Sequence, residues 1–266
     1  MATSQPQTRL ASFGSIRLAY EEQGAGPVVL SAHGLTASRA AVEKLALADF
    51  SPVSRAFRFV SYDARGHGAS TGTTSPADYA WSALSQDMLA LADLLSPAAA
   101  VSCIGLSMGT GTLLHAALRA PQRFDRLVLT APPTAWATRA AQTQFYERIA
   151  TFAEESSPEK LRELFRKSPA APIFHDVPTH PVDPDIPHAF VPAVFRGAGL
   201  SDLPSPEALS TLEHRALILA WDTDPGHPVS TAERLHELLK NSELHISKTS
   251  ADIRTWGERV LQFLSS

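Results

Sequence analysis

The sequence predicts an α/β fold with a mostly parallel sheet, because strand-like and helix-like segments alternate along the chain. Short apolar runs rich in β-branched residues alternate with longer segments of helical spacing in the first half of the chain and again near its end. Strands that alternate with helices form a mostly parallel sheet with helices on both faces. The chain has 266 residues, of which 44% are hydrophobic and 19% charged, and this suits one large domain with a sizeable core.

The expected elements follow from these runs. Strands are predicted at 16–24, 27–34, 57–63, 100–105, 124–133, 215–222 and 243–247. Helices are predicted at 38–50, 76–95, 107–120, 134–155, 157–167, 230–241 and 253–264. Glycine or proline follows several of these segments, as is typical where a strand or helix ends.

The alternation of strands and helices stops in the middle of the chain. Two helical segments are followed there by a proline-rich stretch, which holds seven of the chain's 20 prolines between Pro169 and Pro192. A long irregular loop inside a compact domain is usually a lid or a binding loop. We therefore expect residues 133–213 to form a cap, inserted into a core made of residues 1–132 and 214–266.

Composition and charge exclude several classes of function. The formal net charge of −4 and the pI near 6.2 do not attract a polyanion, so no nucleic-acid partner is expected. No apolar run approaches the length of a membrane span, and the N-terminal stretch lacks the blocks of a secretory signal. The single cysteine, Cys103, excludes an internal disulfide and is expected to be a small buried residue of a core strand. We expect a cytoplasmic protein with a small-molecule substrate and no cofactor; the sequence leaves its oligomeric state open.

The stretch Gly105-Leu106-Ser107-Met108-Gly109 lies between a predicted strand and a predicted helix. Such a Gly-x-Ser-x-Gly pentad arises by chance in about one chain in twenty of this length, so its context decides its meaning. A serine at a sharp strand-to-helix turn projects above the carboxyl end of the sheet, and flanking glycines let neighbouring backbone approach it. The pattern predicts a nucleophile at Ser107; the alternative is an ordinary turn in which Ser107 is the helix N-cap.

A second glycine turn follows an earlier predicted strand, at His33-Gly34-Leu35. Glycine there lets the chain double back, so that the backbone N–H of Leu35 faces the nucleophile. Together with the N–H of Met108 it is expected to form an oxyanion hole for a tetrahedral intermediate.

Four motifs together resemble the α/β-hydrolase superfamily, in its capped branch of small hydrolases. They are His33-Gly34, Asp63-x-Arg65-Gly66-His67-Gly68-x-Ser70, Gly105-x-Ser107-x-Gly109 and the loop Ala220-Trp221-Asp222-Thr223-Asp224-Pro225. The resemblance covers essentially the whole chain and implies a sheet of about eight strands with an inserted helical cap. It does not settle the reaction, because the fold also hosts lyases and non-catalytic proteins.

The resemblance also implies where the catalytic acid lies, in the loop after the strand that follows the cap. Asp224 takes the place of that acid, Trp221 the place of the usual glycine, and Pro228 the place of a later proline. A carboxylate there orients a histidine and stabilises its charged form. Asp222, two residues earlier, is expected to be a solvated loop residue.

The family's usual C-terminal histidine is absent from this chain. Asp252 stands in its place, and no histidine follows His245, which lies inside the last predicted strand. His227 is the candidate base instead, because it follows Asp224 by three residues at the same end of the sheet.

Three alternatives to His227 stay open. In the first, a cap histidine closes over the nucleophile when substrate binds; the candidates are His175, His180 and His188. These could also be metal ligands with Asp176, Asp183 and Asp185, but their spacing matches no compact metal motif, so no metal is expected. In the second, Asp252 is the base, which requires burial to raise its pKa well above 4. In the third, the chain has no base.

The sequence therefore predicts a serine hydrolase that acts on an ester-like or activated acyl bond of a small, largely apolar molecule. Two alternatives are a degenerate α/β hydrolase that only binds a ligand, and a lyase or cyclase that uses the same pocket without an acyl-enzyme. Aromatic cap residues are expected either to line the pocket or to pack between cap and core; they are Trp136, Phe145, Tyr146 and Phe190.

Overall fold

A computed structural model describes residues 7–178 and 183–266. These residues form an eight-stranded sheet in the order β1-β2-β4-β3-β5-β6-β7-β8. The strands are Arg9–Phe13 (β1), Ile16–Gln23 (β2), Val28–Ala32 (β3), Arg58–Tyr62 (β4), Val101–Leu106 (β5), Phe124–Thr130 (β6), Arg215–Trp221 (β7) and Ser242–Ser247 (β8). Strands β3 to β8 run parallel, whereas β2 is antiparallel to both β1 and β4. The predicted α/β fold with a mostly parallel sheet is confirmed.

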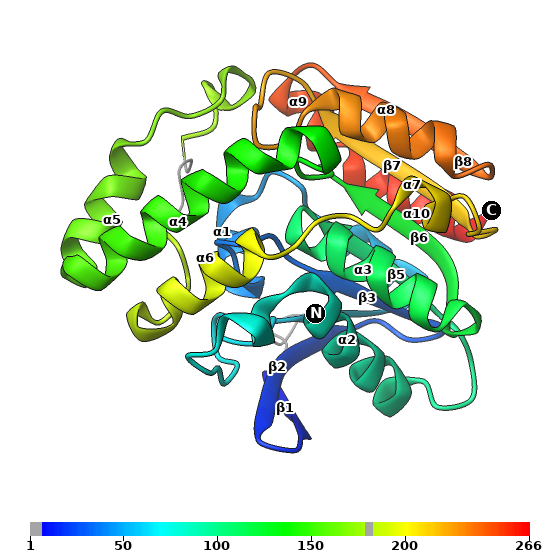
Figure 1. The fold of residues 1–266 in the computed structure, drawn as a ribbon. Helices are drawn as coiled ribbons and strands as arrows, with labels where there is room; N and C mark the ends of the chain where they lie inside the picture. Colours follow the sequence, from blue (N-terminus) through cyan, green and yellow to red (C-terminus); the bar gives the residue numbers. More distant parts are fainter. Residues whose placement is uncertain (1–6, 179–182) are drawn as a thin grey trace.

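Helices cover both faces of this sheet (Figure 1). They are Arg39–Leu45 (α1), Trp81–Leu95 (α2), Met108–Arg119 (α3), Arg139–Glu155 (α4), Pro158–Lys167 (α5), Val191–Gly199 (α6), Pro206–Leu209 (α7), Val229–Leu238 (α8), Ser250–Ile253 (α9) and Trp256–Ser265 (α10). Helices α2, α3 and α8 pack in one buried cluster with the sheet, and α10 packs in another. The site described below therefore rests on a sheet that is fixed from both sides.

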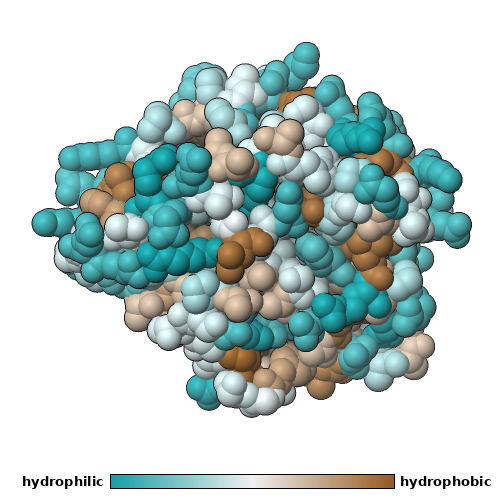
Figure 2. Space-filling view, viewed as in Figure 1, coloured by the Kyte–Doolittle hydropathy of each residue, from teal (hydrophilic) through white to brown (hydrophobic). Residues whose placement is uncertain are grey.

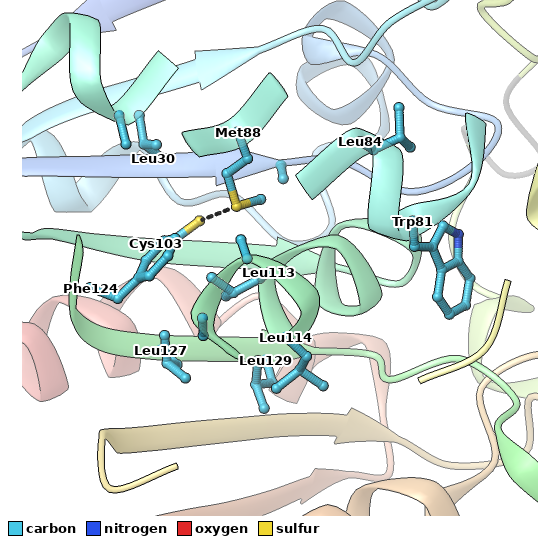
Figure 3. Close-up of a cluster of buried hydrophobic side chains, with 14 of the residues drawn as sticks. Leu30, Trp81, Leu84, Met88, Cys103, Leu113, Leu114, Phe124, Leu127 and Leu129 are labelled. Atoms are coloured by element: carbon cyan, nitrogen blue, oxygen red, sulfur yellow. Dashed lines mark hydrogen bonds between the residues drawn. The ribbon is translucent and has the colours of Figure 1, made fainter. Parts of the chain in front are cut away.

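The first of these clusters contains the only cysteine of the chain. Figure 3 shows Cys103 on β5 facing Met88 of α2, with 3.9 Å between the two sulfur atoms. Cys103 is fully buried, and this burial raises the pKa of its thiol. It is a core residue of a strand, as expected.

Four elements were not predicted: β1, α6 and the short helices α7 and α9, which have four residues each. Strand β1 is short and mostly exposed, so its sequence shows little of the alternation that marks a half-buried strand. Helix α6 begins at Val191, at the end of the proline-rich stretch, and continues to Gly199, where no helix was predicted. Its Pro192 stands in the first helical turn, where the backbone N–H needs no intrahelical partner and proline is tolerated.

Helices α4, α5 and α6 lie together on one side of the molecule, at the left of Figure 1. They share a third buried cluster, which includes Ile149 of α4, Leu161 of α5 and Phe195 of α6. Buried Arg139, at the start of α4, places its guanidinium 4.4 Å from the ring centroid of Trp81 and donates from Nε to Ser201 O at 2.7 Å. These contacts attach α4 to the helices that cover the sheet.

The surface is mixed on the face that Figure 2 draws, with hydrophobic residues scattered among hydrophilic ones. Within residues 7–178 and 183–266, no helix is both long enough and apolar enough to cross a membrane.

Candidate active site

Ser107 lies at the turn between β5 and α3, with φ 53° and ψ −108°. Positive φ is strained for a residue with a side chain, and such strain is found where a structure holds a group for function. The two flanking glycines are required for close approach. A Cβ on Gly105 would lie 2.4 Å from Gly109 O, and one on Gly109 would lie 2.3 Å from Ala32 O. The side chain of Ser107 makes no N-cap hydrogen bond, so the alternative of an ordinary N-cap serine is wrong.

His227 is the hydrogen-bond partner of this serine. Its Nε2 lies 2.8 Å from Ser107 Oγ, and its Nδ1 lies 2.7 Å from Oδ2 of Asp224. An ionised carboxylate can only accept, so Nδ1 carries the ring proton and donates it to Asp224. Nε2 is then free to accept the proton of the Ser107 hydroxyl. The structure thus brings together Ser107, His227 and Asp224, which are the three residues that the sequence analysis proposed as nucleophile, base and acid.

The carboxylate of Asp224 has three donors. Besides His227, the backbone N–H of Gly226 donates to Oδ1 at 2.9 Å and the indole Nε1 of Trp221 donates to Oδ2 at 3.0 Å. Burial alone would raise the pKa of Asp224. The charge of His227 and these hydrogen bonds outweigh burial and lower it to about 2. Asp224 is therefore ionised at neutral pH and able to orient the imidazole.

Neighbouring segments fix the loop that carries both residues. Thr223 has φ 63°, and its Oγ1 accepts a hydrogen bond from Ile173 N at 3.1 Å. The N–H of Thr134 donates to Gly226 O at 3.1 Å, and the N–H of His227 donates to Asp224 O at 3.0 Å. The path of this loop is thus set by contacts with residues that lie far away in the sequence.

The two amides expected to form an oxyanion hole belong to residues near Ser107. Met108 begins α3 directly after Ser107, and a Cβ on Gly34, next to Leu35, would lie 3.5 Å from Ser107 Cβ. In the described part of the chain, neither amide N–H donates a hydrogen bond. Both donors are therefore available to a ligand at Ser107.

Two buried histidines hold the turn at Gly34. His33 places Nδ1 2.8 Å from Gly34 O, and its Nε2 accepts from Ala64 N at 2.9 Å. His67 places Nε2 2.7 Å from Leu35 O. Burial, followed by the charge of His67, lowers the pKa of His33 to about 4, so this ring is neutral. These rings have structural contacts and make none with Ser107.

A pocket of about 310 Å³ opens beside Ser107. Apart from Asp224 and His227 it is lined by uncharged side chains, and most of them are apolar: Leu35, Val42, Leu45, Leu47, Ala48, Leu106, Phe145, Tyr146, Phe165, Phe174, Phe195 and Trp221. Of the aromatic cap residues expected here, Phe145 and Tyr146 line the pocket. Trp136 instead donates from Nε1 to Pro204 O at 3.0 Å, and Phe190 packs against the buried cluster that α4, α5 and α6 share.

The two described histidines of the proline-rich stretch, His175 and His188, do not line the pocket at Ser107. His175 places Nδ1 3.0 Å from Pro172 O, and buried Nε2 of His188 has no hydrogen-bond partner among the described residues. His180 lies outside the described residues. Within residues 7–178 and 183–266, no three His, Cys, Asp or Glu side chains are grouped so that they could hold a metal ion.

Asp252 does not meet the condition for a base. Its Oδ2 lies 2.8 Å from Nε2 of His245. Burial alone would raise the pKa of Asp252, but hydrogen bonds from His245 and Ser247 and the charges of His245 and Arg259 lower it below its usual value. The alternative that required a raised pKa at Asp252 is therefore wrong.

Comparison with known proteins places this geometry in a family. The family model described as alpha/beta hydrolase fold matches residues 27–162, more than half of the chain. The chain belongs to the α/β-hydrolase fold family. It is accordingly a hydrolase in the general sense of that family.

Solved structures of this family are similar over almost their whole length. A hydrolase from Pseudomonas aeruginosa PA01 is 23% identical with a TM-score of 0.73, covering 99% of this chain and 100% of the other. The enol-lactonase from Burkholderia xenovorans LB400 is 20% identical with a TM-score of 0.68, covering 97% and 100%. A thermophilic esterase from Thermogutta terrifontis is 22% identical with a TM-score of 0.68, covering 98% and 97%. No protein of curated function matches the chain. At these identities the similarity establishes the fold.

Sequence reasoning missed the residues that support the triad. Trp221 was read only as a replacement for a glycine, and Thr223 and Ile173 were not considered. A tryptophan three residues before an expected acid was the available signal, because a buried indole N–H needs an acceptor. Nothing in the sequence pointed to the contact between Ile173 and Thr223.

Proposed function

We propose that this chain is a serine hydrolase that cleaves an ester-like or activated acyl bond in a small, largely apolar molecule. One observation carries the proposal: Ser107 Oγ, the ring of His227 and the carboxylate of Asp224 form an unbroken hydrogen-bonded chain, with distances of 2.8 and 2.7 Å. Nucleophile, base and orienting acid in this order are the arrangement that activates a serine hydroxyl.

The proposed reaction has two halves. In the first, His227 Nε2 takes the hydroxyl proton while Ser107 Oγ bonds to the acyl carbon, and the amides of Leu35 and Met108 bind the resulting oxyanion. Collapse of this intermediate breaks the bond to the leaving group, which receives the proton from His227. In the second half, His227 Nε2 deprotonates a water that attacks the acyl carbon; collapse of this second intermediate breaks the bond to Ser107 Oγ, which takes the proton back from His227 as the acid product leaves. Asp224 remains ionised and stabilises the imidazolium in both halves.

The lining of the pocket supports an uncharged substrate. No Lys or Arg side chain lines it, so a substrate carboxylate or phosphate would enter an apolar space without a counter-charge and pay the cost of desolvation. We infer that residues 133–213 act as a cap that completes the pocket, because Gln142, Phe145, Tyr146 and Phe165 of α4 and α5 line it.

A series of p-nitrophenyl esters tests the proposal. We expect turnover of butyrate to octanoate esters, and at least tenfold lower kcat/KM for a hemisuccinate ester, whose carboxylate finds no counter-charge. Ser107→Ala should lose activity and labelling by an alkyl fluorophosphonate, whereas the exposed-serine control Ser210→Ala should retain both. Intact-mass analysis reports the label.

The two alternatives from sequence predict other outcomes. A ligand-binding protein would bind apolar molecules without turnover and would not be labelled at Ser107. A lyase or cyclase would retain its own reaction when acyl-enzyme formation is blocked. An unlabelled and inactive wild type would overturn the serine-hydrolase proposal.

A further inference from the structure

Trp221 ends β7 and places its indole N–H on the catalytic acid. Nε1 donates to Asp224 Oδ2 at 3.0 Å, and this is the same oxygen that accepts from His227 Nδ1 at 2.7 Å. Two side-chain donors therefore converge on one carboxylate oxygen, while the backbone of Gly226 holds the other. With both oxygens occupied, the carboxylate cannot rotate without breaking a charge-assisted hydrogen bond.

The indole itself is fixed by aromatic contacts. Trp221 is 8% exposed and stacks on Trp256, with 5.5 Å between ring centroids and 10° between planes. Phe174 meets it edge-on at 5.1 Å and 84°. The imidazole of His227 lies 5.3 Å away at 81°. Trp221 thus touches the base through its ring and the acid through its N–H.

We propose that Trp221 is a positioning residue for the reaction: its N–H and ring hold the Asp224 carboxylate and the His227 imidazole in the geometry that reaches Ser107. This inference rests on the proposed function, because it assigns Trp221 a role through that triad. It adds a fourth side chain, from a strand end rather than from a loop, to the machinery.

The physical need for such a residue follows from where the base lies. Acid and base share one loop, and a loop holds a side chain less rigidly than a strand or helix does. Trp221 is the last residue of β7, and its ring is buried against the α10 residue Trp256. It therefore connects the loop that carries Asp224 and His227 to the rigid core of the sheet. A small displacement of a catalytic group is enough to lower the rate strongly.

Loss of the indole N–H should shift the pH–rate profile and lower kcat. The N–H withdraws negative charge from Oδ2, so its removal leaves a more basic carboxylate facing His227. A more basic carboxylate favours the imidazolium form. The acid limb of the pH–rate profile is therefore expected to move to higher pH, while kcat falls because the pair is less well ordered.

The test compares two tryptophans that each donate an indole N–H. Trp221→Phe keeps an aromatic ring and removes the N–H. Replacing Trp221 by 3-benzothienylalanine keeps both fused rings and exchanges the N–H for sulfur. Trp136→Phe is the matched control, because Trp136 does not line the pocket and its Nε1 donates at 3.0 Å to Pro204 O rather than to Asp224. Activity is measured on the p-nitrophenyl ester that the wild type cleaves best.

We expect both Trp221 variants to lower kcat about tenfold with little change in KM, and to raise the midpoint of the acid limb by about 0.5 pH unit. Trp136→Phe should leave kcat and the midpoint within twofold and 0.1 unit of wild type. The proposal is overturned if the benzothienyl variant matches wild type in both readouts, or if Trp136→Phe changes both as much as Trp221→Phe does.

A second readout separates this inference from the proposed function. The ring titration of His227 can be followed by NMR in wild type and in Trp221→Phe, with His227→Ala for assignment, whether or not an ester is cleaved. A rise of the midpoint in Trp221→Phe supports the inference even if the substrate class is wrong, and an unchanged midpoint contradicts it. Failure of fluorophosphonate labelling in wild type, in contrast, contradicts the proposed function.

Discussion

His227 and Asp224 lie three residues apart on one loop, and Nδ1 of His227 is 2.7 Å from Oδ2 of Asp224. The backbone N–H of His227 also donates to Asp224 O at 3.0 Å, so the two residues are hydrogen-bonded through both their backbones and their side chains. In this chain the proposed acid and base are therefore close in sequence, whereas Ser107 lies 120 residues before His227.

The first prediction concerns which histidine is the base. His227→Ala should lower kcat for a chromogenic ester by about 10³-fold or more, because Ser107 Oγ loses the proton acceptor that lies 2.8 Å from it. His245→Ala is the matched control: His245 pairs with Asp252 at 2.8 Å and should leave kcat within about twofold of wild type. Equal losses in the two variants would refute the assignment of His227.

The second prediction concerns the acid. In Asp224→Asn the side-chain amide can donate to the imidazole and favours the tautomer that cannot accept from Ser107, so kcat should fall by about 10³- to 10⁴-fold. Asp222→Asn is the control in the same loop; its Oδ1 accepts only from Thr223 N. It should retain most of the activity. Steady-state kinetics with purified variants of verified fold measure both, and an active Asp224→Asn enzyme would speak against the triad.

The third prediction is the effect of pH on the free energy of unfolding. The pKa of Asp224 is lowered to about 2 in the folded chain, against about 3.9 in an unfolded one. A lowered folded-state pKa stabilises the fold above pH 4, and this contribution is lost as the pH falls towards 2. Between pH 5 and pH 3 wild type should therefore lose about 1 kcal/mol more than Asp224→Asn. Urea unfolding at the two pH values measures this difference in the free energy of unfolding. Equal losses in wild type and Asp224→Asn would contradict the lowered pKa.

The sheet and its order of elements could be predicted because they depend on local patterns. The runs that became β3, β5, β6 and β7 are largely apolar and buried for most of their length, and such runs are visible in a sequence. The hairpin partner β1 was missed because its side chains are mostly exposed. Helix α6 was missed because the prolines around it were interpreted as loop residues, although Pro192 occupies a position that starts a helix.

Part of the candidate site could also be predicted, because it depends on local sequence patterns. Ser107 follows from a turn whose geometry requires flanking glycines, and Asp224 and His227 follow from their place after a core strand. The contacts that fix their loop could not be predicted, since they join Thr223 to Ile173 and Gly226 to Thr134. Such pairings join segments that are distant in sequence, and tertiary packing decides them. The same is true of the indole of Trp221, which stacks on Trp256.

The last prediction tests the turn that presents the nucleophile. A Cβ at Gly109 would lie 2.3 Å from Ala32 O and 2.8 Å from its carbonyl carbon, which are backbone atoms of a central strand. Gly109→Ala must therefore push α3 away from β3, and we expect it to lower the free energy of unfolding by about 3 kcal/mol. Activity should fall as well, because the same movement separates Met108 N–H from Leu35 N–H.

Gly199→Ala in α6 is the control for this turn. Its Cβ would meet Thr143 Cγ2 at 3.6 Å, an ordinary contact, so helix propensity alone should make the change neutral or slightly stabilising. Denaturant unfolding and ester hydrolysis are measured on both variants. If Gly109→Ala stays within about 0.5 kcal/mol of wild type, the close packing of α3 on β3 is not what holds Ser107 in its strained conformation. If it is destabilised while Gly199→Ala is not, the backbone approach at Gly109 is the physical reason for a glycine two residues after the nucleophile.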